Sequence, residues 1–272
     1  KMARRIAQLR RCLTSASSNR GVALVIGAGD ATGGAICRAF AQQGLIVAAV
    51  RRNGADLAPL IQQIESAGGS ARAFGVDARK EEQMVDLVEH VEKLGPIEVF
   101  VHNIGANIGP HSVLDMTSKK YYKVWEMAAF SAFLSGREVA KRMVARGHGT
   151  MIFTGATAAL RGARYTLFHV VQQPCSGHCA FSGAMHAKRA LAQSMAREFG
   201  PQGLHISHVV VDGAIDTKFV RELFPSKVAE DEQVGSAMLQ PDDIARNYVH
   251  LWQQPRSAWT FEMDLRPWVE HW

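Results

Sequence analysis

The fold is decided near the start of the chain, where residues 22–43 read VALVIGAGDATGGAICRAFAQQ. An apolar run at 22–26 is followed by a glycine-rich turn and then by a helical pattern at 35–43. A glycine-rich turn between a strand and a helix lets backbone N–H groups and the positive end of the helix meet a pyrophosphate. The stretch therefore predicts a strand–turn–helix unit that binds a dinucleotide; the simpler interpretation is a tight turn alone.

The alternation of strand and helix continues along the rest of the chain. Further apolar strands are expected at 45–50, 71–77, 97–103, 150–155 and 205–211, and helices at 56–68, 81–95, 121–145, 180–200 and 240–252. Apolar runs without polar alternation are typical of strands that are buried on both faces of a parallel sheet. We therefore expect an α/β fold, a doubly wound and mostly parallel sheet with helices on both faces. No internal repeat or linker interrupts the pattern, so residues 21–272 are expected to form one domain.

The excess of basic residues is confined to the N-terminus. Residues 1–20 contain six of the 31 Lys and Arg residues and no acid, which leaves 25 basic residues against 25 acidic ones. The body of the chain is therefore neutral, and we expect no nucleic-acid partner. Hydrophobic residues make up 47% of the chain, but no window is long and apolar enough to predict a membrane span.

Residues 1–20 are predicted to be a separate basic extension. An acid-free segment rich in Arg and Ser is typical of a mitochondrial transit peptide, and the alternative is a solvent-exposed extension or an oligomer arm. The four cysteines, Cys12, Cys37, Cys175 and Cys179, form no disulfide framework, which favours a reducing compartment. We expect a cytoplasmic protein, with the mitochondrial matrix as the alternative.

The spacing Gly27-x-x-x-Ala31-x-Gly33 resembles the G-x-x-x-G-x-G turn of the short-chain dehydrogenase/reductase family, with Ala31 in place of the middle glycine. Further segments that are similar to the family follow in its order across residues 22–265: GVD (75–77), VHNIG (101–105) and VDGAIDT (211–217). The resemblance implies a seven-stranded Rossmann-type sheet and a homodimer or homotetramer. It also implies a nicotinamide dinucleotide cofactor.

The resemblance also implies which residues contact that cofactor. Asp77 stands at the position of the acid that contacts the adenine in the family. Thr217 is expected to approach the nicotinamide carboxamide, and Asp212, in the turn before it, replaces the family's proline. The expected cofactor-binding residues are Gly27, Gly29, Ala31, Thr32, Gly33, Arg51, Arg52, Asp77, Asn103, Gly105 and Thr217.

The end of the second strand bears on the choice between NADP and NAD. An acid there binds the ribose hydroxyls of NAD, whereas an arginine accommodates the phosphate of NADP. This chain has Arg51 and Arg52, although both could simply be solvated, and Asp30 in the first turn opposes a phosphate. We predict NADP(H), with NAD as the alternative.

The family's catalytic tetrad of Asn, Ser and Tyr-x-x-x-Lys has no match in this chain. Aligning the helix at 180–200 on Glu198 places Phe181 at the tyrosine and Met185 at the lysine; the other register would pair Ala184 with Lys188, and both lack a phenol. The equivalent positions are therefore Ala128, Ala156, Phe181 and Met185. Phe for Tyr and Met for Lys keep the volume and remove the proton-transfer groups.

These replacements favour a dinucleotide-binding protein that is inactive or weakly active as a dehydrogenase, such as a sensor, a scaffold or an inactive subunit. The alternative is a divergent oxidoreductase in which Tyr165 and His169, from an insertion at 161–178, act as acid and base. An apolar lid is the plainer interpretation of that insertion. A structural oligomer with an emptied cofactor site is disfavoured by the glycines of the turn.

Two further hypotheses concern metals and oligomers. The spacing of Cys175, His178, Cys179 and His186 matches no standard zinc pattern, so no metal is expected. The helices at 121–145 and 180–200 offer apolar faces for pairing with a second copy, or for the core of the same chain. The residues of these faces are Phe130, Phe133, Leu134, Leu191 and Met195.

Overall fold

The computed structural model describes residues 21–106, 111–161, 178–223 and 225–270. The basic extension at 1–20 and the insertion that carries Tyr165, His169 and Cys175 lie outside the described residues, apart from the ends of the insertion.

Seven strands in the described part of the chain form one sheet in the order β3-β2-β1-β4-β5-β6-β7, and every neighbouring pair is parallel. Their bounds are β1 Val22–Ile26, β2 Ile46–Arg51, β3 Ser70–Gly75, β4 Ile97–His102, β5 Gly149–Ala156, β6 Leu204–Val211 and β7 Glu262–Leu265. All six strands predicted from apolar runs are present. β1, β4 and β6 are almost completely buried, as expected for parallel strands that helices cover on both faces. The doubly wound, seven-stranded parallel fold is thus confirmed.

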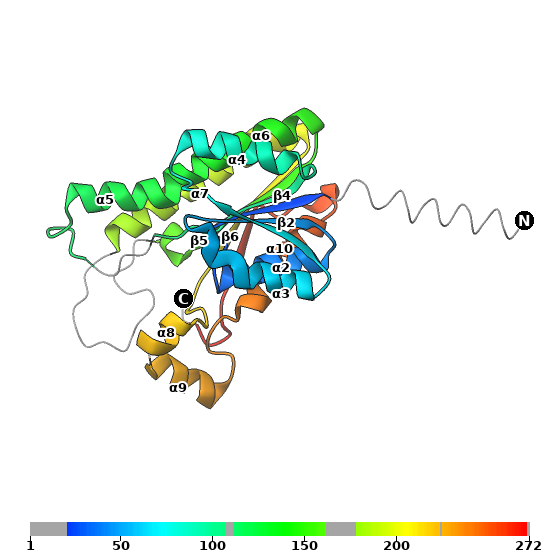
Figure 1. Cartoon of the computed structure of the whole chain (residues 1–272). Coiled ribbons are helices and arrows are strands. Elements are labelled where there is room, and N and C mark those ends of the chain that lie inside the picture. The colour runs from blue at the N-terminus through cyan, green and yellow to red at the C-terminus, as the bar shows by residue number, and fades with distance from the viewer. Residues whose placement is uncertain (1–20, 107–110, 162–177, 224, 271–272) are drawn as a thin grey trace, which may run out of the picture.

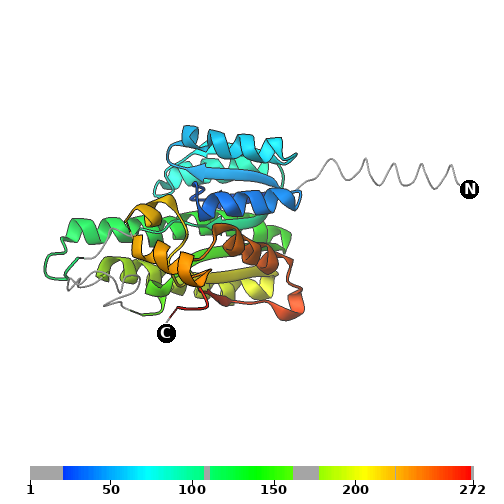
Figure 2. The same cartoon turned by 90° about the horizontal axis from the view of Figure 1, so that it is seen from below.

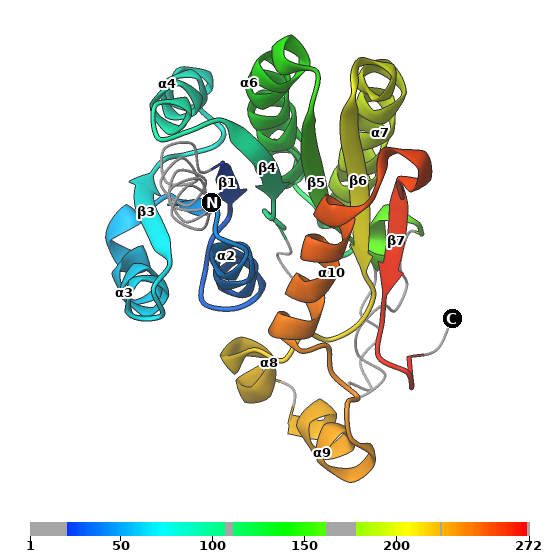
Figure 3. The same cartoon turned by 90° about the vertical axis from the view of Figure 1, so that its right-hand side faces the viewer.

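Helices cover both faces of this sheet (Figures 1 and 3). On one face lie α4 (Glu81–Glu92), α6 (Ser131–Arg146) and α7 (Cys179–Phe199); on the other lie α2 (Thr32–Gln42), α3 (Ala58–Ser66) and α10 (Pro241–Gln253). Each layer encloses its own hydrophobic core, one around Phe100 and Phe153 and the other around Phe40 and Tyr248. The two cores hold the carboxyl ends of all the strands at one edge of the sheet.

The long helix expected at 121–145 is interrupted. α5 (Ser118–Trp125) and α6 are joined by a π-helical turn, η2 (Glu126–Phe130), which contains Ala128. The hydroxyl of Ser131 donates to the carbonyl of Met127, and His102 Nε2 lies 2.9 Å from the same hydroxyl oxygen. The widened turn is therefore stabilised by a buried side chain at the end of β4.

Two short helices, α8 (Lys218–Leu223) and α9 (Pro225–Val234), follow Thr217 and lie beyond the carboxyl edge of the sheet (Figures 1 and 2). The carbonyl of Gly235, just after α9, accepts a hydrogen bond from Trp268 of the C-terminal segment. Four 3₁₀ turns complete the described structure: η1 (Gly54–Leu57), η3 (Thr157–Ala159), η4 (Gly200–Gln202) and η5 (Arg256–Ala258). Within the described ranges, no helix has the length and apolarity that crossing a bilayer requires.

Candidate dinucleotide-binding site

The glycine-rich turn between β1 and α2 is packed too tightly for side chains at three of its glycines, Gly27, Gly33 and Gly34. Gly27 has a φ of +89°, and a Cβ there would lie 2.8 Å from the carbonyl oxygen of Asn103. A Cβ on Gly33 would collide with the carbonyl of Gly27. Ala31 precedes α2 with a φ of −99°, so the position of the family's middle glycine tolerates a methyl group here.

Asn103 ties this turn to the neighbouring strand. Its backbone N–H donates to Ile26 O (2.8 Å), and its side-chain Nδ2 donates to Gly27 O (3.2 Å). β1 and β4 are adjacent strands whose following helices lie on opposite faces, α2 on one and α6 on the other. This arrangement opens a crevice at the carboxyl edge, where open α/β sheets bind their ligands.

Two adjoining cavities occupy the crevice. The first, of about 620 Å³, extends from the turn to the ends of β2 and β3, and the second, of about 400 Å³, extends from the turn to α7 and the end of β6. They share Gly27, Gly29, Asn103 and Gly105. Every residue that the sequence analysis named for the cofactor lines one or both: Arg51, Arg52 and Asp77 the first, and Ala31, Thr32, Gly33 and Thr217 the second.

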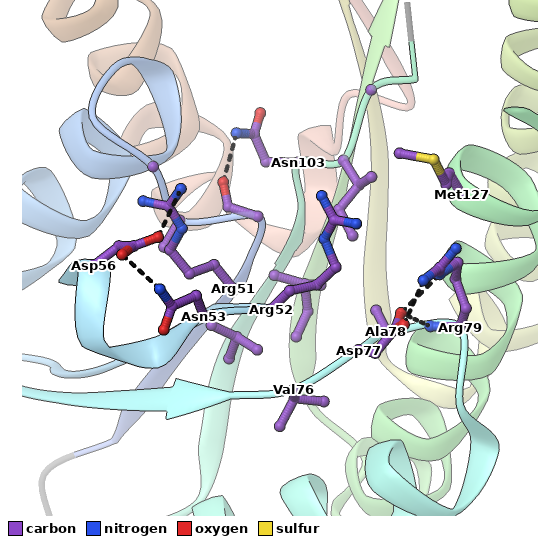
Figure 4. A pocket seen from close by; sticks show the side chains of 17 residues that line it. Arg51, Arg52, Asn53, Asp56, Val76, Asp77, Ala78, Arg79, Asn103 and Met127 are labelled. Carbon is purple, nitrogen blue, oxygen red and sulfur yellow. Dashed lines mark hydrogen bonds and ion pairs between the residues drawn. The ribbon is translucent and has the colours of Figure 1, made fainter.

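Arginines dominate the first cavity (Figure 4). Arg51 lies 3.5 Å from a carboxylate oxygen of Asp56 and 3.8 Å from one of Asp30. Asp30 therefore partly neutralises Arg51, and its own negative charge is partly compensated in return. Within the described ranges no ion pair involves Arg52, whose charge remains available at the cavity.

Asp77 is held by a neighbour that the sequence analysis did not identify. Arg79 Nε donates to Asp77 Oδ1 at 2.8 Å, and Arg79 Nη2 donates to Asp77 Oδ2 at 2.5 Å. These hydrogen bonds lower the pKa of the Asp77 carboxyl below its ordinary value, so the group is charged at neutral pH. The sequence feature that could have predicted this pair is the arginine two residues after the acid, just before α4.

The second cavity brings together three of the four tetrad-equivalent positions. Ala156, Phe181 and Met185 line it, and Ala128 lies in the same hydrophobic cluster as these three residues. Of the described residues that line this cavity, Asp30 is the only one with an ionisable side chain, and it belongs to the first turn. Phe181 and Met185, the described residues that α7 contributes to this lining, therefore carry no side-chain group that could donate a proton.

The structure distinguishes the two registers considered for α7. Phe181 and Met185 line the cavity, whereas Ala184 is buried beneath it. Lys188 is completely buried, and its amino group is bonded to the carbonyl oxygens of Ile104 and Thr154. Of the two registers, the structure thus brings Phe181 and Met185 to the cavity and turns Lys188 away from it.

Thr157, one position beyond Ala156, also turns away from the cavity. Its hydroxyl donates to Asp212, and both side chains are buried. Asp212, which stands where the family has a proline, thus binds the hydroxyl of the residue that follows β5. The contact joins residues 55 positions apart, so no local sequence pattern predicts it.

The structure also bears on the apolar helix faces and on the metal site considered in the sequence analysis. Leu134 (1% exposed) and Met195 (6% exposed) pack in the intramolecular core, the second of the two alternatives for these helix faces, and Met195 also lines an outer groove beside Leu191. Phe133, by contrast, has 39% of its surface exposed. Among the described residues, no three His, Cys, Asp or Glu side chains gather closely enough to hold a metal.

Comparison with known proteins agrees with this architecture. The sequence model of the family described as short chain dehydrogenase matches residues 21–228. A short-chain dehydrogenase/reductase of Armillaria gallica is 32% identical over 246 residues, which cover 85% of this chain and 88% of that protein. The crystal structure of a short-chain dehydrogenase from Rhodopseudomonas palustris is 40% identical, with a TM-score of 0.75 over 91% of this chain and 99% of that one.

A metagenomic short-chain oxidoreductase crystallised in complex with NADP shares the fold at 21% identity, with a TM-score of 0.73 over 93% of this chain and 100% of that one. A parallel sheet of this order, with a glycine turn and a crevice where its winding reverses, defines a nucleotide-binding class of α/β protein. Within that class, the chain belongs to the short-chain dehydrogenase family.

Proposed function

We propose that this protein binds NADP(H) and that its activity as a dehydrogenase is weak or absent, so that it serves as a sensor, a scaffold or an inactive subunit. The observation that carries the proposal is the composition of the second cavity. Ala156, Phe181 and Met185, which the sequence aligns with the family's Ser, Tyr and Lys, line this cavity.

The first cavity and the turn fit a dinucleotide. A side chain at Gly27 or Gly33 would collide with the backbone that shapes the turn, whereas Gly29 faces open space in both cavities, and the N-terminus of α2 faces the same crevice. Arg52 is suited to a 2′-phosphate, and the charged carboxylate of Asp77 to the amino group of adenine. The bound cofactor would supply or accept a hydride at its nicotinamide ring.

The expected deficit is in the proton that must accompany the hydride. Phe181 has no proton to deliver, Met185 has no charge with which to tune one, and Ala156 has no hydroxyl to hold a carbonyl oxygen. Positioned acid–base groups accelerate such steps by about 10²–10⁴-fold, and the loss of several members of one catalytic unit is not additive. Cofactor binding and carbonyl reduction are therefore separable in this protein.

The test combines binding with turnover. Thermal melting with NADPH and with NADH measures binding, because a ligand that binds only the native state at about a hundredfold over Kd adds ~2.7 kcal/mol of stability. A panel of aldehydes, ketones and quinones with both cofactors measures turnover. We expect a larger melting shift with NADPH and no turnover above background. Robust turnover, or no shift with either dinucleotide at millimolar concentration, would overturn the proposal.

The second candidate function is a divergent oxidoreductase. It is favoured by catalytically named relatives, such as a cyclohexanol dehydrogenase of an Acinetobacter strain, which is 25% identical over 84% of this chain and 86% of that protein. If the panel reveals turnover, Tyr165→Phe and His169→Ala test whether the insertion supplies the acid and base. Turnover that survives both substitutions would exclude this candidate mechanism.

A further inference from the structure

Lys188 is the only lysine or arginine among the fully buried large side chains of the described structure. It lies on α7, with 0% of its surface exposed, and its Nζ donates to Ile104 O at 2.6 Å and to Thr154 O at 3.1 Å. Taking a lysine out of water is costly unless its polar group finds partners. This side chain therefore carries an interaction that a leucine of similar volume could not supply.

The two carbonyls lie where two strands separate. The register of β4 with β5 ends at His102 and Phe153, whereas β5 continues alongside β6 as far as Ala156 and Val211. Ile104 O and Thr154 O both lie beyond the last β4–β5 pair. The amino group of Lys188 thus bridges the segments at the ends of β4 and β5, just past the last residues at which these two strands pair.

Both bridged segments form walls of the cavities. Ile104 stands between Asn103 and Gly105, which line both cavities, and Thr154 begins the run to Gly155 and Ala156, which line the second. On the other face of the sheet, the hydroxyl of Thr154 lies 2.7 Å from the hydroxyl of Tyr248. Thr154 is therefore held from both sides, by α10 through its side chain and by α7 through its carbonyl.

We propose that Lys188 is a positioning residue for the dinucleotide site: its buried amino group fixes the distance between the carboxyl ends of β4 and β5, and with it the wall that would receive the nicotinamide half of the cofactor. The proposal rests on the proposed function for its ligand, but the tether itself is a property of the free protein. The side chain acts from behind the wall, three residues along α7 from Met185.

The tether does not depend on the charge of the lysine. An amine retains two N–H donors after it loses its proton, and two carbonyls accept them here. The titratable side chains that face Lys188 are His102 from β4 and His208 from β6, the latter paired with Glu262 of β7. Within the described ranges no carboxylate is bonded to Lys188, so its role is to donate hydrogen bonds to the backbone.

The first experiment needs no ligand. Lys188→Met removes both hydrogen bonds and keeps an unbranched side chain, and Met195→Ala is the matched control, a cavity-creating change in the same helix. Amide hydrogen exchange is followed at residues 103–105 and 154–156. We expect exchange there to accelerate about tenfold or more in K188M relative to M195A. Equal exchange in the two variants would overturn the tether.

The second experiment separates the two halves of the site. Dissociation constants are measured for NADPH and for adenosine 2′,5′-bisphosphate, which carries only the adenosine half. In K188M we expect the constant for NADPH to rise about tenfold, while that for the fragment stays within about twofold of the wild-type value. An equal loss for both ligands would indicate general destabilisation and overturn the proposal.

The outcomes remain distinguishable if a variant or a ligand fails. If K188M does not fold, Lys188→Gln retains two N–H donors on a shorter chain, and a smaller change in the same direction is expected in both experiments. If the wild-type protein binds neither ligand, the proposed function fails, while the exchange experiment still decides whether Lys188 fixes the two strand ends.

Discussion

We expect the choice between NADPH and NADH to depend most directly on the side chain of Arg52. Arg51, its neighbour, shares its charge with Asp30 and Asp56, whereas no ion pair engages Arg52 within the described ranges. A 2′-phosphate at the first cavity would find its strongest partner there, because hydrogen bonds between charged groups are the stronger ones.

Arg52→Glu is therefore expected to raise the Kd for NADPH by about tenfold or more and to leave that for NADH nearly unchanged. The matched control is Arg72→Glu, which reverses an arginine on β3 that pairs with Glu65 outside the first cavity. Isothermal titration with both dinucleotides measures the effect. A parallel loss of both affinities in R52E would mean that the arginine does not select the phosphate.

The tetrad-equivalent positions carry the next prediction. Restoring all four groups, with Ala128→Asn, Ala156→Ser, Phe181→Tyr and Met185→Lys, is expected to install slow carbonyl reduction. The same change places polar atoms in a hydrophobic cluster and should cost about 1–3 kcal/mol of stability. Steady-state assays and urea denaturation of the quadruple variant provide the two measurements. Turnover in the unmodified protein equal to that of the variant would contradict the prediction.

Lys188 makes stability depend on pH. Burial lowers the pKa of its amino group from 10.5 to about 7 in the folded protein. Between these values the unfolded chain binds the proton and the folded chain does not, so raising the pH favours the folded state. From pH 7 to pH 9 the free energy of unfolding is expected to gain ~2 kcal/mol from this residue.

Urea denaturation of the wild type and of K188M at these two pH values isolates the contribution of Lys188, because the other titrating groups are common to both proteins. We expect the stability difference between the two proteins to shift in favour of the wild type as the pH rises. A difference that stays constant would show that the amino group does not lose its proton in this range.

At the scale of elements, apolar runs predicted six strands and most helices because buried parallel strands have few alternatives. β7 escaped prediction, since its four residues, EMDL, are short, half polar and at the sheet edge. α8 and α9 lack a strong apolar period, and no residue of α9 is buried. The π-turn η2 escaped too, because it depends on Ser131 and His102 rather than on a local pattern.

The candidate site divides in the same way. Glycines and arginines that belong to local motifs could be assigned from the sequence by resemblance, and they line the two cavities. The partners of Thr157 and Lys188 could not, because Asp212 and Ile104 lie far along the chain from them. Only the packing of α7 on the sheet and the pairing of β6 with β5 bring these residues together.

α6 and α7 also present a shared outer groove of about 440 Å³, lined in part by Phe133, Leu191 and Phe199. We propose that this face pairs with a second copy of the chain, as the resemblance to the family implies. Phe133→Glu is expected to reduce the assembly to a monomer near 29.7 kDa by light scattering. Val85→Glu on α4, where the side chain is 40% exposed against 39% for Phe133, is the control. A wild-type monomer at micromolar concentration would contradict the proposal.

At the scale of the whole molecule, we propose one domain at 21–272 and a separate extension at 1–20, which holds the excess charge. Limited proteolysis is expected to remove residues 1–18 without changing the melting temperature. A large fall in stability after trimming would indicate an oligomer arm or a docked helix instead. A fluorescent reporter fused behind residues 1–20 distinguishes the proposed cytoplasmic location from import into mitochondria.

The position of β7 at the sheet edge has a consequence for how the protein is made. Glu262 accepts hydrogen bonds from Arg189 of α7 and lies 3.0 Å from Nδ1 of the buried His208 of β6. On the ribosome, β1 to β4 can pair as soon as they emerge, but these two side chains await a residue that follows the six other strands of the described sheet in the chain. A chain cut short before residue 262 would keep its glycine turn and its arginines. It would still leave β6 without its neighbour β7, and we expect proteases to degrade it faster than the complete sheet.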